Sequence, residues 1–236
     1  MTDTPLPTLA VEDGVAVITL DDGKANVFSD AVVARLEDLL DEVEAGPARS
    51  LVLVGRPGKF SAGFDLGEMT ASLEGMRALV SRGARWWARL YGFGLPTVAA
   101  CTGHALAGGA ITLLACDVRI GADLPAKIGL SEVAIGMPLP KFAVELARDR
   151  LTKASFTMST MGATVYDPAG AASVGYLDRV VPEDELLAEA LETARALGAL
   201  STGAFARTKT NVRGAVIAQV LAELDADMAS VDGPST

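Results

Sequence analysis

Two short apolar runs constrain the fold of this chain more than any other feature of the sequence. LVLV at 51–54 and TVAAC at 97–101 lack the alternation of polar and apolar residues that a half-exposed strand shows. Strands buried on both faces are typical of a parallel sheet covered by helices. VRIGA at 118–122 is a further strand, and helical patterns lie between the strands. The repeated order of strand, loop and helix predicts an α/β fold with loops gathered at the carboxyl ends of the strands.

The N-terminal part of the chain contains turn and cap signals. TLAV and VAVITL flank the pair Asp13-Gly14, which predicts a β-hairpin. Ser29 is placed to cap a helix that ends at Gly46, because apolar residues recur between them at helical spacing. A second helical stretch covers residues 72–91.

The C-terminal part of the chain is mainly helical. Asp167-Pro168 is a cap followed by proline at the first helical position, and an Ala/Leu/Glu-rich helix starts near Pro182. No charged or low-complexity linker separates this part from the rest. We therefore predict one continuous domain with a core at residues 1–166 and a helical C-terminal region at residues 167–236.

Composition and charge exclude several classes of protein. The chain has 236 residues, of which 50% are hydrophobic, and a formal net charge of −10, which argues against nucleic acid as the main partner. Its single histidine, His104, excludes a histidine-rich metal site and leaves little basis for a Ser-His-Asp triad. No apolar stretch approaches the roughly 18 to 20 residues that a membrane span needs.

The cysteines and the N-terminal residues indicate where the protein is expected to work. Cys101 and Cys116 lie in apolar runs and are interpreted as buried thiols, since their surroundings suit neither a bridge nor a metal pair. The first residues, MTDTPLPTLAVEDG, contain no basic region followed by an apolar segment, so they do not resemble a secretory signal. These features predict a cytoplasmic protein.

Two glycine-rich loops each follow a buried strand. GKFSAGFDL at 58–66 follows the first strand, and GHALAGG at 103–109 follows the second and leads into an apolar helix. A helix N-terminus offers backbone N–H groups and a dipole that favours negative charge. Either loop alone has a simpler explanation, because glycine commonly allows a helix to pack closely on a strand. Two such loops can also converge on one ligand oxygen and form an oxyanion hole.

Two motifs resemble those of a known family: GRPGKFSAGFDLGEM at 55–69 and GHALAGGAITLLACDVRI at 103–120. They look like the crotonase superfamily, also called the enoyl-CoA hydratase/isomerase family, and the resemblance extends from Val11 to Met228. It implies a ClpP-like spiral of ββα units with a helical C-terminal region that trimerises. It also implies an acyl-CoA substrate, with coenzyme A as part of the thioester and no permanently bound cofactor. The expected assembly is a homotrimer or a dimer of trimers.

Members of this family share a pair of backbone N–H groups that hold the thioester oxygen while an enolate develops. By position, the resemblance assigns these groups to Phe64 and Gly108. It places further residues at the substrate or its CoA group: Lys24, Ala25, Ser61, Ala62, Gly63, Asp65, Leu66, Gly109 and Ile111. Asp65 occupies a position that usually holds the loop in this family, rather than one that supplies a second catalytic acid.

Members that resemble hydratases carry two glutamates, and this chain has one of them. The first position is Ile111, whereas the second is Glu132 in the segment Gly129-Leu130-Ser131-Glu132. Adding water to a double bond requires a positioned and activated water, and isoleucine can neither orient nor deprotonate one. Moving a double bond from the 3,4 to the 2,3 position requires one carboxyl that takes a proton from C2 and returns it at C4. We expect this carboxyl in an apolar pocket that favours its protonated form.

Four segments look most like the Δ3,Δ2-enoyl-CoA isomerase branch of the family: RPGKFSAGFDLGEM, WWARLYGFGL, AGGAITLLACD and IGLSEVAIGMPLPKF. We therefore predict an isomerase of fatty-acid metabolism that converts 3-enoyl-CoA to 2-enoyl-CoA, with Glu132 as the acid and base. Two alternatives stay open. One is an enoyl-CoA hydratase that acts through Glu132 alone, and the other is a non-catalytic acyl-CoA-binding protein. Other crotonase chemistries that keep the oxyanion hole are also compatible with the motifs.

Cationic and aromatic residues supply further candidates. Possible partners of the CoA phosphates are Lys24, Arg56, Lys59 and Lys209, although each also fits an ordinary solvated charge. Trp86 and Trp87 fit either the core or an acyl tunnel, because they lie on an aromatic stripe at helical spacing. Met137 and Phe142 are similarly placed near the expected catalytic loop.

Overall fold

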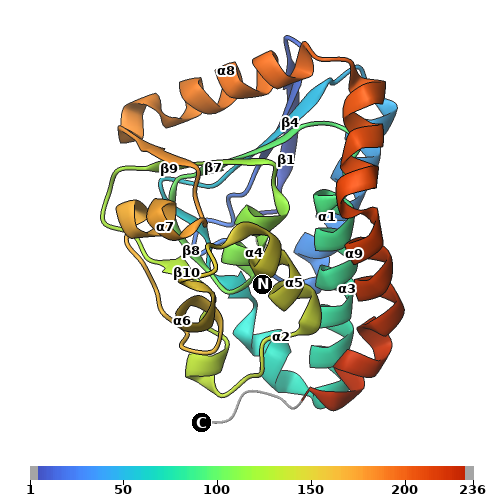
Figure 1. The fold of residues 1–236 in the computed structure, drawn as a ribbon, viewed down its shortest axis with the longest axis vertical. Coiled ribbons are helices and arrows are strands. Elements are labelled where there is room, and N and C mark those ends of the chain that lie inside the picture. Colours follow the sequence, from blue (N-terminus) through green and yellow to red (C-terminus); the bar gives the residue numbers. More distant parts are fainter. Residues whose placement is uncertain (1–4, 232–236) are drawn as a thin grey trace.

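A six-stranded sheet forms the centre of the computed structural model, which describes residues 5–231 (Figure 1). Its strands in spatial order are β1 (Thr8–Glu12), β2 (Val15–Thr19), β4 (Ser50–Val54), β7 (Thr97–Cys101), β9 (Val118–Ala122) and β11 (Arg179–Val181). β1 and β2 form the predicted antiparallel hairpin, and all other neighbours are parallel. Every residue of β4 and β7 is buried, as their apolar sequences predicted.

Short strands leave the main sheet directly after three of its strands. β5 (Gly58–Ser61), β8 (Gly103–Leu106) and β10 (Ile128–Gly129) follow β4, β7 and β9 in the chain and form a separate parallel sheet. A two-stranded ladder of β3 (Val27–Phe28) and β6 (Gly63–Phe64) adjoins it. Each of β4, β7 and β9 is thus followed by short strands and then by a helix, and the same ββα order occurs in β2, β3 and α1. The sequence patterns did not predict the short strands, because two to four residues are too few to establish a period.

Helices cover both faces of the main sheet. On one face lie α1 (Asp30–Ala45), α3 (Leu73–Tyr91), α4 (Gly108–Ala115) and α5 (Lys141–Arg150), which share the larger apolar core with that side of the sheet. α8 (Leu186–Gly198) crosses the opposite face, where Leu186, Ala190 and Ala194 pack on residues of β4, β7 and β9. The predicted cap of α1 is confirmed, since the Ser29 hydroxyl accepts a hydrogen bond from the Val32 amide.

The region after residue 166 is mainly helical, and it also adds β11 to the main sheet through pairing with β9. Its last helix, α9 (Thr202–Ser230), lies along α3 and touches α5. Shorter elements complete the described chain: α2 (Leu66–Ala71), α6 (Phe156–Thr160), α7 (Pro168–Val174), and the 3-10 turns η1 (Val133–Ile135) and η2 (Glu183–Glu185). Residues 1–4 and 232–236 of the two predicted regions lie outside the described part. No helix within residues 5–231 has the length and apolar character needed to cross a membrane.

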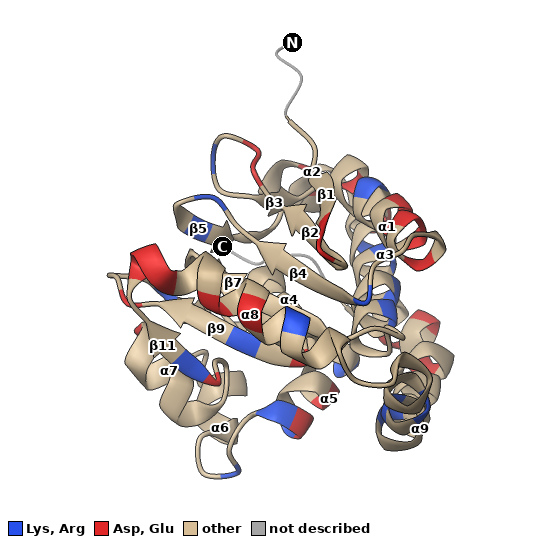
Figure 2. Ribbon diagram, turned by 90° about the horizontal axis from the view of Figure 1, so that it is seen from above, with Lys and Arg blue, Asp and Glu red and all other residues tan. Residues whose placement is uncertain are grey.

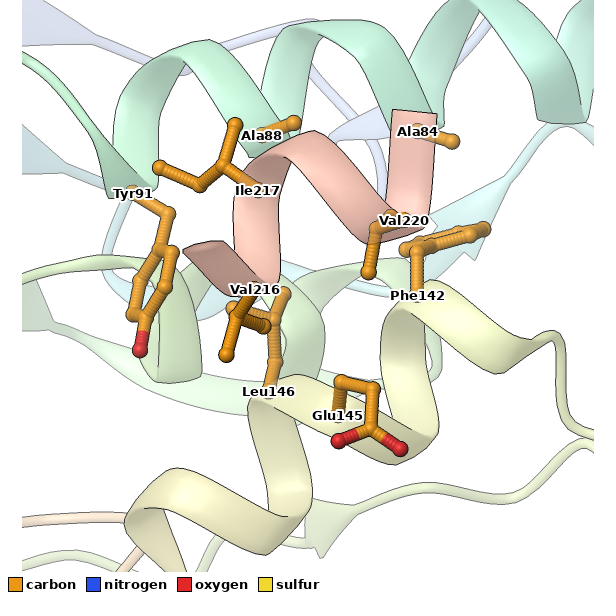
Figure 3. Close-up of a pocket in the computed structure, with 9 residues that line it drawn as sticks. All are labelled: Ala84, Ala88, Tyr91, Phe142, Glu145, Leu146, Val216, Ile217 and Val220. Atoms are coloured by element: carbon orange, nitrogen blue, oxygen red, sulfur yellow. The ribbon is translucent and has the colours of Figure 1, made fainter. Parts of the chain in front are cut away.

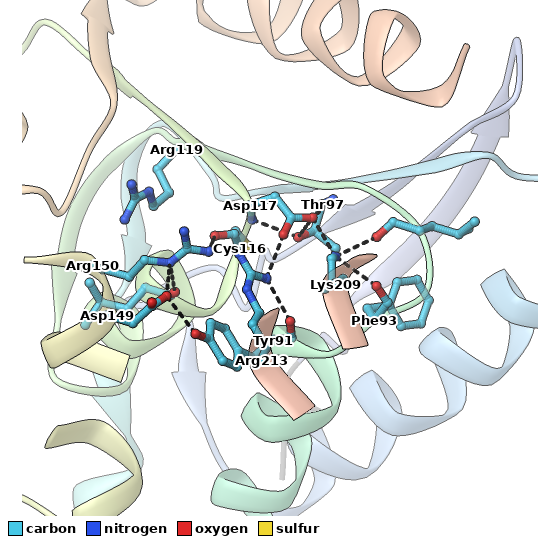
Figure 4. A network of polar contacts seen from close by, with 12 residues as sticks. Tyr91, Phe93, Thr97, Cys116, Asp117, Arg119, Asp149, Arg150, Lys209 and Arg213 are labelled. Atoms are coloured by element: carbon cyan, nitrogen blue, oxygen red, sulfur yellow. Dashed lines mark hydrogen bonds and ion pairs between the residues drawn. The ribbon is translucent and has the colours of Figure 1, made fainter. Parts of the chain in front are cut away.

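A largely buried acid, Asp117, fastens α9 to the strands of the main sheet (Figure 4). Asp117 accepts hydrogen bonds from Lys209 Nζ at 2.6 Å and from Arg213 at 2.7 Å, and its carboxylate also binds the Thr97 amide at 2.8 Å. The side chains of Lys209 and Arg213 are only 4% and 9% exposed. The prediction that Lys209 binds a CoA phosphate is therefore wrong. Its ammonium group is enclosed, and it also donates to the Phe93 and Leu95 carbonyls.

Candidate active site

The two glycine-rich loops meet at Gly63 and Gly108, as the oxyanion-hole hypothesis requires. Gly63 has φ +92°, and a Cβ added to it would lie 2.9 Å from the Ala107 Cβ and 3.1 Å from the Gly108 amide nitrogen. A side chain at position 63 would therefore fill the space beside that amide. The structure thus brings the residue before Phe64 next to the predicted second N–H donor.

Gly109 allows a second close approach between the same two loops. A Cβ at this position would lie 2.2 Å from the Ser61 carbonyl oxygen, a distance that no side chain can adopt. Ser61 itself is fully buried, and its hydroxyl accepts a hydrogen bond from the Gly63 amide at 3.2 Å. Gly63 and Gly109 therefore contribute through their backbone and close packing, and the Ser61 hydroxyl adds a hydrogen bond that helps to fix the first loop.

The second donor lies at the first residue of a buried helix. Ala107 precedes α4 with φ 48° and ψ −117°, and the Ile111 amide makes the first helical hydrogen bond, to the Ala107 carbonyl at 2.9 Å. The Gly108 N–H is one of the first amides of the helix, which have no acceptor within it. The positive end of the helix dipole adds to its attraction for a negative oxygen. No side chain within residues 5–231 caps α4, so this helix start is suited to receive a ligand oxygen.

A pocket of about 820 Å³, a volume that includes space open to solvent, lies beside the two loops. It is lined by Ala62, Phe64, Leu66, Met69, Val80, Leu106, Ala107, Ile111, Ser131, Glu132, Ile135, Met137, Pro140 and Phe142. Nearly all of these are apolar, and the Glu132 carboxyl is the one acidic group among them. We call this space the acyl pocket, after the acyl-CoA substrate that the sequence motifs predict. An apolar cleft with one acid suits an apolar ligand. The acid is suited to transfer a proton to or from that ligand.

Glu132 is buried at the edge of this pocket. The residue is 8% exposed, and its Oε2 has no hydrogen-bond partner among the described residues. Burial raises the pKa of the Glu132 carboxyl to about 7, and hydrogen bonds from the Glu132 and Ser131 amides oppose this shift only in part. Two backbone hydrogen bonds fix the turn that begins at Glu132, since the Ile135 and Met137 amides both donate to the Glu132 carbonyl. A carboxyl with this pKa can accept and return a proton near neutral pH.

The other candidate carboxyl near the loops has a structural position. Asp65 is the N-cap of α2, and its Oδ1 accepts a hydrogen bond from the Glu68 amide at 3.0 Å. Asp65 does not line the acyl pocket, whereas Ile111 does and is 2% exposed. The pocket therefore has an aliphatic side chain on the α4 side and a single acid on the side of η1.

Cations gather at the loops next to the β5 edge (Figure 2). Arg56 donates to the Lys24 carbonyl at 2.9 Å, and the Ala62 amide donates to the Ala25 carbonyl at 3.0 Å, so the loop that carries Lys24 lies against the loop before Phe64. The buried side-chain amide of Asn26 fixes this arrangement, because its Nδ2 donates to the backbone carbonyls of Leu20, Lys59 and Phe60.

Lys127 belongs to the same group of cations, and the sequence patterns did not identify it. The Lys127 amide donates to His104 Nδ1 at 2.9 Å. Burial is the main cause of the lowered pKa of His104, and the positive charges of Lys59 and Lys127 lower it further. Only the pairing of β5, β8 and β10 brings these residues together. Three lysines and Arg56 thus form a cationic edge in an otherwise acidic protein, and Arg56 is paired there with Asp21 at 3.2 Å.

The aromatic stripe on α3 belongs to the core. Trp86 and Trp87 are 1% and 0% exposed, and neither lines the acyl pocket. Trp87 supports the pocket from behind, since its ring contacts Phe64 at 5.3 Å and stacks on Phe142 at 5.7 Å between centroids. Met137 and Phe142 are themselves pocket residues, as their place in the sequence suggested.

Residues 10–232 match the model of the enoyl-CoA hydratase/isomerase family. The chain belongs to this family. It is 32% identical to human mitochondrial enoyl-CoA delta isomerase 1 over 224 residues, which cover 91% of this chain and 72% of the human protein. It is 34% identical to a probable enoyl-CoA hydratase of Mycobacterium bovis over 208 residues, covering 85% of this chain and 78% of that protein.

The solved structure of an enoyl-CoA hydratase/isomerase family protein from Pseudomonas syringae has the same fold. It matches with a TM-score of 0.92 at 39% identity, over 95% of this chain and 97% of that chain. This enoyl-CoA hydratase/isomerase family member therefore has the crotonase fold that the two motifs predicted. Both isomerases and hydratases occur among proteins of similar identity, so the residues of the pocket have to distinguish the two reactions.

Proposed function

We propose that this enzyme moves the double bond of a 3-enoyl-CoA to the 2,3 position. The observation that carries the proposal is the single acid of the acyl pocket: Glu132 is buried with a raised pKa, and Ile111 occupies the second acid position. One carboxyl is sufficient for proton transfer between two carbons of the same chain. It is a poor basis for hydration, which needs a bound water to be oriented and deprotonated while a second proton is delivered.

The proposed reaction uses the backbone amides and Glu132 in turn. The N–H groups of Phe64 and Gly108 bind the thioester oxygen and stabilise the negative charge that develops there. The Glu132 carboxylate removes a proton from C2, and the electrons of that C–H bond form a dienolate that extends to the thioester oxygen. When the dienolate collapses, C2 and C3 become doubly bonded, and the protonated Glu132 delivers its proton to C4. The apolar lining protects this intermediate from water.

The remaining contacts of the substrate are proposals of the same kind. The CoA phosphates bind at the cationic edge formed by Lys24, Arg56, Lys59 and Lys127, because charge-assisted hydrogen bonds suit phosphate oxygens. Ala25, Ala62 and Leu66 contact the thioester arm from the adjoining loops. We further propose a homotrimer or a dimer of trimers in the cytoplasm.

Product analysis tests the reaction type. The purified enzyme is given a 3-enoyl-CoA and, separately, a trans-2-enoyl-CoA, and the products are separated and weighed by mass spectrometry. The proposal predicts conversion of the first substrate into 2-enoyl-CoA at unchanged mass, with no water added to the second. A gain of water on the second substrate without isomerisation of the first would establish a one-glutamate hydratase instead. Tight binding without any turnover would establish an acyl-CoA-binding protein.

The raised pKa of Glu132 predicts a pH dependence. The reaction needs the carboxylate form, so kcat/KM for a 3-enoyl-CoA should rise about tenfold per pH unit at acidic pH and level off above about 7. Stability follows the opposite direction. The pKa of Glu132 in the folded protein lies above the ordinary value of 4.5, so the neutral carboxyl favours the folded state. Its contribution to the free energy of unfolding is complete below pH 4.5 and is lost as the pH rises through about 7. Rate profiles and thermal unfolding across this range measure both effects, and a rate that is flat down to pH 5 would contradict the assignment.

A further inference from the structure

The segment between Glu132 and α5 forms one wall of the acyl pocket. Met137, Pro140 and Phe142 all line the pocket, and the Met137 amide ties the start of this wall to the Glu132 carbonyl at 3.0 Å. The end of the wall is the beginning of α5. Its position therefore depends on how the first turn of that helix is held.

The first turn of α5 has no cap of its own. Residue Pro140 occupies the cap position, and no side chain of the segment accepts a hydrogen bond there. The acceptor comes from α9 instead, because Asp227 Oδ2 binds the Lys141 amide at 2.8 Å. Asp227 is 9% exposed, and its negative charge at a helix N-terminus is also favoured by the helix dipole. One turn earlier on α9, Glu223 pairs with the Lys141 ammonium group at 2.9 Å.

α9 also packs directly behind the wall (Figure 3). Phe142 lines the acyl pocket on one side and a small apolar cavity on the other, where Val216, Ile217 and Val220 of α9 face α3 and α5. Beyond this cavity, the Arg77 guanidinium on α3 donates to the Val231 carbonyl at the end of α9. α9 is thus anchored on α3 at a point close to Asp227 in the chain and is able to hold the wall in place.

We propose that Asp227 is a positioning residue, which fixes the wall at residues 137–142 and thereby determines how well the pocket accepts long acyl chains. This inference rests on the proposed acyl-CoA function. Glu132 acts on carbons next to the thioester, and we infer that the carbons beyond them are the ones that extend to Phe142. Loss of the Lys141–Asp227 hydrogen bond lets the first turn of α5 unwind. The long chain then loses apolar contact, whereas a short chain keeps its contacts.

The test measures binding of saturated acyl-CoA thioesters, which cannot isomerise. Titration calorimetry compares butanoyl-CoA with decanoyl-CoA on the wild type and on Asp227→Ala. The expected result is a Kd for decanoyl-CoA raised about tenfold, equivalent to the contact of about two buried methylenes, and a Kd for butanoyl-CoA changed by less than about twofold. Because no turnover is needed, failure of the proposed isomerisation leaves this readout intact.

Three matched variants separate positioning from general stability. Asp227→Asn keeps an acceptor for the Lys141 amide and should restore the wild-type ratio of the two Kd values. Asp225→Ala removes an exposed acid of the same helix, which pairs with Arg85 at 3.1 Å, and should leave the ratio unchanged. Asp227→Glu keeps the charge and displaces the contact by one methylene, so it should shift the ratio even if Asp227→Ala does not fold. Equal loss of affinity for both thioesters would overturn the proposal, and so would an unchanged ratio in Asp227→Ala or, where that variant does not fold, in Asp227→Glu.

Discussion

Replacing Glu132 by glutamine is expected to lower kcat for isomerisation of a 3-enoyl-CoA by about three orders of magnitude, within the range known for loss of a general acid and base. Glutamine keeps the size of the side chain and its place in the pocket, but it cannot take a proton from C2. Binding should change little, because the oxyanion amides and the apolar lining are untouched. Steady-state kinetics with a 3-enoyl-CoA give kcat, and titration with a saturated thioester gives the affinity.

Asp65→Asn is the matched control for this experiment. Asparagine is also a good helix N-cap, so the variant removes the second acid near the loops while keeping the hydrogen bond to the Glu68 amide. Its kcat should stay within about twofold of the wild type, because capping is retained. Full turnover by Glu132→Gln, or a large loss of turnover in Asp65→Asn with normal binding, would contradict the assignment of the two acids.

Asp117→Ala is expected to lower the free energy of unfolding by about 3–5 kcal/mol, the usual cost of removing one partner from a buried ion pair. The substitution leaves Lys209 and Arg213 enclosed without their counter-charge, and it also removes the acceptor of the Thr97 amide. Since α9 is fastened to the sheet mainly through this acid, its N-terminal half should detach first. Urea unfolding measures the loss, and hydrogen exchange locates it.

The exposed pair of Arg85 and Asp225 provides the comparison. It joins α3 to the same helix at 3.1 Å, but its side chains are 53% and 88% exposed. Asp225→Ala should therefore change the free energy of unfolding by less than about 1 kcal/mol. Similar losses in the two variants would mean that burial does not distinguish the two contacts, and the account of how α9 is held would be wrong.

The parts of the fold with their own local signals were predicted from the sequence. Ser29 caps α1, the Asp13-Gly14 pair turns the hairpin, and β4 and β7 are buried as their apolar composition indicated. The strands β5, β8 and β10 were not predicted, because their short, glycine-containing sequences are extended only through pairing with one another. β11 was missed for the same reason, since it lies in a mainly helical region and exists through its pairing with β9.

The candidate site divides in the same way. The glycines at 63, 108 and 109 and the acid at 132 were assigned through the resemblance to the crotonase motifs, and the structure shows close backbone approach at the glycines and burial of the acid. The charged residues were harder to place. Lysine is usually a surface residue, but Lys209 pairs with Asp117 in the interior. Lys127 lies at the cationic edge only because the small sheet of β5, β8 and β10 brings it there. Such contacts between distant parts of the chain leave no local pattern.

The path of one proton tests the central claim most directly. A 3-enoyl-CoA that carries deuterium at C2 is converted in ordinary water, and the 2-enoyl-CoA product is examined by NMR for deuterium at C4. If Glu132 alone shuttles the proton inside an apolar pocket, a measurable part of the label must arrive at C4. An isomerised product without label at C4 would mean that solvent, and not one buried carboxyl, supplies the second proton. Formation of a 3-hydroxyacyl-CoA in place of the isomer would contradict the account altogether.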